Sequence, residues 1–264
     1  LSGQPYGWSD WLRDGIAGLK DRSVAARLEE KLEKSTHADE MVSIAGEVLW
    51  AAREDGSYVP WMERAFVRRH VADQGLADTL KKLVTAQDVF ATTNYDLLLE
   101  EATGLPALTY EEPGAAFEML DQRRSTHVLH IHGLYDPKRG IDNIVADDAQ
   151  YDKLLACQGA QFVQRILGTR TLVFVGCGKT TDDPNLSRLL PFVREQLALE
   201  RNYYFLYAGG RVPEGLPDGV IPVRYGDTYA DLHHFLEKLA WTRLQARMAG
   251  SPLIGRLPDK AEGE

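Results

Sequence analysis

The spacing of apolar positions divides the chain into two parts. From residue 8 to 84, apolar residues recur at the spacing that puts them on one face of a helix. The segment 38–53 is an example. A turn signal follows at Asp55-Gly56, and Pro60 suits the start of another helix. We therefore expect a mainly helical subdomain over 8–84, with helices that include 24–34, 38–53, 61–71 and 77–84.

From residue 87 the pattern alternates between short apolar runs and helical periodicity. The run 171–175 is apolar on both faces, which is typical of a strand in a sheet covered on both sides. This alternation predicts an α/β fold with a doubly wound, mostly parallel, Rossmann-like sheet. The expected strands are 87–92, 106–109, 127–132, 170–176, 202–208 and 220–225. The expected helices are 96–103, 115–121, 147–156, 159–168, 185–199 and 228–245.

We expect residues 1–264 to form a single domain. It would consist of the helical subdomain at 8–84, a Rossmann-like core at 87–245, and a linker or tail at 246–264, where proline and glycine recur.

Composition narrows the class of protein. The net charge of -9 argues against a dedicated nucleic-acid-binding surface. No apolar run approaches the roughly 18 residues that a membrane span needs, and no secretory signal is visible. Cys157 and Cys177 are the only cysteines, which excludes a four-cysteine zinc ribbon and a disulfide framework. The chain therefore fits the cytoplasm, where thiols stay reduced.

Two polar motifs follow predicted strands. Thr92–Asp96 reads Thr-Thr-Asn-Tyr-Asp, and His130–Gly133 reads His-Ile-His-Gly. In an open parallel sheet, the carboxyl ends of the strands border the ligand crevice, so an amide, a carboxylate and an imidazole would converge there. The alternative for Asn94 or Asp96 is a cap on the helix that begins near Leu97.

The histidines of the second motif allow several interpretations. His130 and His132 would face the same side of a strand and His127 the other. A metal site lacks an obvious third ligand, so we predict none. A core histidine with satisfied hydrogen bonds is the alternative for His127 and His130. His132 ends the strand and precedes Gly133, where a missing side chain permits close approach of a ligand, so His132 suits a general base.

Two further turns carry candidate binding residues. Gly178-Lys179-Thr180 suggests a phosphate-binding P-loop, but that motif needs a glycine where Val173 stands. We interpret the segment as a glycine turn after a strand, with Asp183 as the cap of the next helix. At the end of the last strand, Asp227 or Thr228 either caps the final helix or contacts an adenosine.

Together these motifs resemble the sirtuin-like domains of bacterial antiviral defence proteins. The matching segments are Thr92–Asp96, His132-Gly133, Phe174–Gly178 and Asp183–Leu186, in the same order over 87–190. Gly3–Trp8 resembles the segment after that family's first phosphate-binding turn, so we expect the turn itself upstream of Leu1. The cysteine-bound zinc module of lysine deacylases is absent from the sequence.

The resemblance implies a sirtuin-type fold that hydrolyses NAD+ to nicotinamide and ADP-ribose without a metal. Asn94 would orient the attacking water, His132 would act on a ribose hydroxyl, and Asp96 would hold the nicotinamide or ribose side. The remaining candidate cofactor-binding residues are Thr93, Tyr95, Gly133, Gly176, Gly178, Asp183 and Asp227.

Other functions stay open. A non-catalytic module that senses NAD+ or ADP-ribose is the main alternative, ahead of an NAD-dependent deacylase or an ADP-ribosyltransferase. The resemblance also implies an abortive-infection effector that depletes NAD+. Because such activity would harm the cell, we expect gating by homo-oligomer assembly or by a partner domain or protein, with no membrane or nucleic acid bound.

Overall fold

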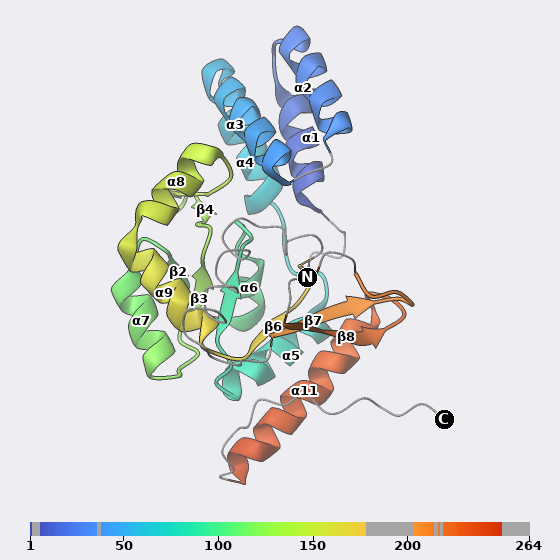
Figure 1. Cartoon of the computed structure of the whole chain (residues 1–264), viewed down its shortest axis with the longest axis vertical. Helices are drawn as coiled ribbons and strands as arrows, with labels where there is room; N and C mark the ends of the chain where they lie inside the picture. The colour runs from blue at the N-terminus through green and yellow to red at the C-terminus, as the bar shows by residue number, and fades with distance from the viewer. Residues whose placement is uncertain (2–5, 36–37, 178–202, 214–215, 217–218, 250–264) are drawn as a thin grey trace.

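The computed structural model describes residues 1, 6–35, 38–177, 203–213, 216 and 219–249. A group of helices forms one end of the molecule, short parallel strands lie in the middle, and the long helix α11 (Asp231–Met248) lies at the other end (Figure 1).

The N-terminal part is helical, as predicted. It comprises α1 (Trp8–Gly18), α2 (Arg22–Lys34), α3 (Ala38–Asp55), α4 (Tyr58–Met62) and α5 (Gln74–Thr85). The predicted helix 61–71 is wrong in its bounds, because α4 passes into the π-helical turn η1 (Glu63–Val67) and ends there.

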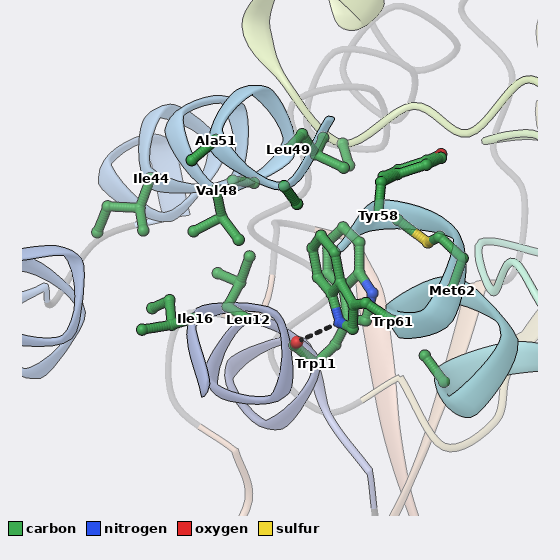
Figure 2. Packing of buried hydrophobic residues seen from close by; sticks show 14 of the residues in the cluster. Trp11, Leu12, Ile16, Ile44, Val48, Leu49, Ala51, Tyr58, Trp61 and Met62 are labelled. Atoms are coloured by element: carbon green, nitrogen blue, oxygen red, sulfur yellow. Dashed lines mark hydrogen bonds between the residues drawn. The ribbon is translucent and has the colours of Figure 1, made fainter. Parts of the chain in front are cut away.

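Aromatic packing holds these helices together. Trp61 stacks on Trp11 with ring centroids 4.8 Å apart, and its indole N–H donates to the Trp11 carbonyl over 3.0 Å (Figure 2). Gly15 lets the rings lie this close, because a Cβ there would be 2.5 Å from the Trp61 ring. This cluster continues into the site, since Tyr95 lies 5.9 Å from Trp11, centroid to centroid.

The first parallel sheet has the strand order β1-β3-β2. It consists of β1 (Phe90–Thr92), β3 (Val128–His130) and β2 (Ala107–Thr109). Thr92 and Thr109 both pair with His130, so all three strands end at the same level. Helix α6 (Leu98–Thr103) follows β1, and α7 (Pro113–Asp121) follows β2.

Helices cover this sheet on both faces. Val89 packs into the cluster built by α7 and α9 (Gln158–Gly168), whereas Phe90 packs into the cluster of α5, α6 and α11. Successive side chains of an extended segment point to opposite faces, so the two clusters lie on opposite sides. This is the layered α/β architecture that the sequence predicts.

The second parallel sheet has the order β6-β7-β8, formed by β6 (Leu172–Phe174), β7 (Tyr203–Ala208) and β8 (Val220–Gly226). All six predicted strands are therefore present, divided between two three-stranded sheets. The predicted helix 185–199 lies outside the described residues. Helix α11 extends to Met248, so the predicted start of a tail at residue 246 is wrong.

One supersecondary element escaped prediction. After β3 the chain forms a short antiparallel hairpin of β4 (Tyr135–Asp136) and β5 (Ile141–Asp142), followed by α8 (Asp148–Ala156). This hairpin places Asn143 and Val145 beside the turn that carries His132 and Gly133.

Candidate functional site

The two strand-end motifs lie next to each other. Besides the pairing of β1 with β3, the amide of Ile131 donates to the Thr92 carbonyl over 3.0 Å. The predicted strand 127–132 ends at His130, so His132 stands in a turn beyond the strand. Both motifs therefore lie at the carboxyl ends of neighbouring parallel strands, as expected, and the meeting of their side chains in one pocket stays a prediction.

Asn94 has an anchored backbone and an exposed side chain. Its amide donates to Thr92 Oγ1 over 3.0 Å, and its carbonyl lies 2.9 Å from His130 Nδ1. Both main-chain polar groups are therefore satisfied within the protein. The carboxamide keeps its donor and acceptor for a ligand or water.

Asp96 lies at the start of α6. Its Oδ1 accepts a hydrogen bond from the amide of Leu98, the first residue of α6, over 3.1 Å, although the N-cap position itself is Leu97. Burial raises the pKa of the Asp96 carboxyl, while the Leu98 hydrogen bond and the field of His130 oppose that rise. A perturbed carboxyl at a strand end also fits a functional site.

His130 is a core histidine, as one interpretation of the sequence expects. Its side chain is 0% exposed, with Nδ1 facing the Asn94 carbonyl and Nε2 lying 2.6 Å from Glu100 Oε1. His127 differs from that expectation, since it is only half-buried and contacts Thr126 Oγ1. Glu100 was not predicted from the sequence, although in the predicted helix 96–103 its spacing of four residues from Asp96 would put both on one face.

His132 lies beneath the surface. It is 2% exposed, and its ring meets Tyr151 of α8 edge to face, with centroids 5.6 Å apart. Its carbonyl accepts a hydrogen bond from the Val145 amide over 2.8 Å. A ligand therefore reaches this imidazole only if the surrounding side chains move.

Gly133 has a structural reason to be glycine. Its φ is +79°, and a Cβ there would lie 1.9 Å from the Asn143 carbonyl oxygen. Asn143 is held in turn, because its Oδ1 accepts from the Leu134 amide and its Nδ2 donates to Glu111 Oε2. The backbone that approaches Gly133 is thus the protein's own.

The other candidates of the first motif have distinct environments. Thr93 is half-buried in the loop after β1. Tyr95 is buried, donates its hydroxyl to the Val145 carbonyl over 2.6 Å, and packs its ring against Phe66 and Trp11. Tyr95 therefore anchors the loop to the helical core, and its contact with a cofactor stays a prediction.

The adenosine-side candidates are only partly described. Gly176 turns with φ +67° and is exposed, whereas Gly178 and Asp183 lie outside the described residues. Asp227 is exposed and pairs with Arg224. The predicted cap by Asp227 or Thr228 is wrong: Asp231 Oδ2 instead accepts from both of their amides.

Two features of the described residues bear on other functions. The described residues contain no group of three or more His, Cys, Asp or Glu side chains arranged to hold a metal ion. Among the helices that the structure describes, none is both long and apolar enough to cross a membrane.

The comparison with known families falls on this region. Residues 88–217, just under half of the chain, match the family model of the SIR2-like domain. The match covers the first parallel sheet and the strands β6 and β7 of the second, and it includes Asn94, Asp96, His130 and His132. The part of the chain that carries both strand-end motifs is therefore sirtuin-like.

Proposed function

We propose that this protein hydrolyses NAD+ at the bond between nicotinamide and ribose. The observation that carries the proposal is the exposed carboxamide of Asn94, held by its own backbone at the carboxyl end of β1 beside the end of β3. The backbone that carries this carboxamide is fixed before substrate arrives, which favours the orientation of a reacting water. SIR2-like domains use NAD+, and the matched region contains this loop.

The reaction needs only a weak nucleophile such as water. The glycosidic bond breaks with its electron pair moving to the cationic nicotinamide nitrogen, which becomes neutral. Water then adds to the anomeric carbon and releases a proton, so NAD+ and water give nicotinamide, ADP-ribose and H+. In this proposal the Asn94 amide orients the water, and Asp96 holds the nicotinamide or ribose side through its partly buried carboxyl.

His132 acts on a ribose hydroxyl in this scheme, as base or through a hydrogen bond. Its burial at 2% exposure means that substrate entry requires rearrangement around Tyr151. That requirement fits an enzyme whose activity is gated by assembly or by a partner, as in a defence effector that depletes NAD+. Hydrolysis rates per protomer that rise with protein concentration would support gating by self-assembly.

The test is chromatographic. The purified protein is incubated with NAD+, and nicotinamide and ADP-ribose are quantified for the wild type, Asn94→Ala and His132→Ala. Equal molar release of both products that is lost in each variant is the expected result. Hydrolysis that survives both substitutions would overturn the assignment.

A second candidate is a module that binds NAD+ or ADP-ribose without turnover. The burial of His132 favours it, because a base that substrate does not reach performs no chemistry. Calorimetry showing tight NAD+ binding, together with no nicotinamide release over hours, would select this function over hydrolysis.

A further inference from the structure

A buried pair of side chains lies behind the Asn94 loop. Glu100, in the first turn of α6, and His130, the last residue of β3, approach within 2.6 Å through Oε1 and Nε2. The other ring nitrogen of His130 reaches the Asn94 carbonyl at 2.9 Å. A chain of contacts thus runs from Glu100 through the imidazole to the backbone of the proposed water-orienting residue.

The partners of the ring fix where its hydrogens lie. A carbonyl oxygen only accepts, so Nδ1 must carry the hydrogen that is donated to Asn94. On the other side, either a carboxylate accepts from Nε2–H or a carboxylic acid donates to Nε2. In both arrangements the Asn94 carbonyl requires the hydrogen on Nδ1, and Glu100 supplies the partner at Nε2 that holds the ring in this orientation.

Packing alone gives no reason for this pair. His130 is 0% exposed and Glu100 is 11% exposed, and Glu100 Oε2 is buried without a hydrogen-bond partner among the described residues. Buried ionic pairs are often replaceable by apolar residues of similar volume without loss of stability. The pair is polar although it is buried, and its remaining contact is with the Asn94 carbonyl. This indicates that the pair acts on that carbonyl.

We propose that Glu100 and His130 are positioning residues for the Asn94 loop. By holding the Asn94 carbonyl, the pair fixes the backbone from which the carboxamide projects, while neither side chain touches the reacting atoms. This inference rests on the proposed NAD+ hydrolysis where its test measures a rate. Where its test measures the hydrogen on the His130 ring, it rests on the contacts of His130 alone.

The kinetic experiment compares two substitutions at one position. Glu100→Gln keeps a donor for Nε2 of a neutral ring that still carries hydrogen on Nδ1. Glu100→Leu leaves Nε2 buried without a partner, so the ring loses the contact that holds it against the Asn94 carbonyl and can turn away from that carbonyl. Because misplacement by about 1 Å can cost about 100-fold in rate, we expect kcat of Glu100→Leu to fall roughly 10- to 100-fold.

KM for NAD+ should stay within about threefold in both variants, and Glu100→Gln should restore kcat to within about threefold of wild type. The matched control is Glu101→Leu, on the same helix, because Glu101 also contacts a histidine ring, His70, but at the exposed surface. Its kcat should stay unchanged. Rates are compared below the unfolding temperature of every variant, so that lost stability does not count as lost kcat.

Two kinetic results would overturn the inference: a Glu100→Leu kcat equal to wild type, or equal losses in Glu100→Gln and Glu100→Leu. Nitrogen NMR of the His130 ring gives a readout independent of activity. We expect hydrogen on Nδ1 in the wild type and in Glu100→Gln. A wild-type ring without hydrogen on Nδ1 would refute the inference even in an active enzyme. An inactive protein with hydrogen on Nδ1 would refute the proposed hydrolysis and leave the contact established.

Discussion

Replacing Gly133 by alanine tests how the turn after β3 is built. A residue with a Cβ at φ +79° pays about 1–2 kcal/mol for the left-handed conformation. The added carbon would also lie 1.9 Å from the Asn143 carbonyl oxygen, a backbone atom that has to move. Overpacking of this kind adds about 1–3 kcal/mol, so the total loss of unfolding free energy should be about 2–5 kcal/mol.

Gly104 provides the matched control. It has φ +76°, nearly the same as Gly133, but a Cβ at Gly104 would meet nothing within 4 Å. Gly104→Ala should therefore show the conformational cost alone, about 1–2 kcal/mol. The difference between the two variants isolates the collision with Asn143.

Urea unfolding followed by far-UV circular dichroism measures both variants. We expect a lower midpoint for Gly133→Ala than for Gly104→Ala, and a melting temperature lower by about 2–4 °C for each further kcal/mol. Equal losses would show that the Asn143 carbonyl yields freely, and would refute the argument that this turn is rigid.

Three further substitutions have definite expected outcomes. Asp96→Asn should raise the free energy of unfolding at neutral pH, because burial raises the pKa of the Asp96 carboxyl and its ionisation therefore opposes folding. This gain should vanish at pH values where the aspartate of the unfolded chain is protonated. Gly15→Ala should lower the melting temperature and shift tryptophan fluorescence, because its Cβ would lie 2.5 Å from the Trp61 ring; unchanged fluorescence would contradict this packing. Arg243→Gln removes the cation 3.0 Å from Asp88, so destabilisation should be larger at neutral than at acidic pH, and pH-independent melting would count against the pair.

The layers of the fold were predictable because they depend on local patterns. Apolar runs bounded by polar turns located every described strand of the two parallel sheets. The hairpin β4-β5 escaped because its strands have two residues each, too few for any alternation to show. The bounds of the helix after α4 failed because a π-helical turn leaves no signature in apolar spacing.

The location of the candidate site was predictable from the sequence, whereas the contacts within it were less so. Two polar motifs after parallel strands had to meet at one sheet edge, and they do. The burial of Tyr95 depends on Trp11 and Phe66, which are distant in sequence and reach the loop only through the folded helical part. The pairing of Glu100 with His130 likewise depends on the register of β1 against β3.

The most direct test of the central claim is nicotinamide release from NAD+ by Asn94→Ala beside Thr126→Ala. Thr126 is exposed and precedes the amino end of β3, whereas the candidate site lies at the carboxyl ends of the strands, so its loss should leave the crevice intact. The account predicts wild-type release by Thr126→Ala and a loss of about 100-fold or more by Asn94→Ala, with NAD+ hydrolysed to ADP-ribose by the wild type. Equal release by both variants would contradict it.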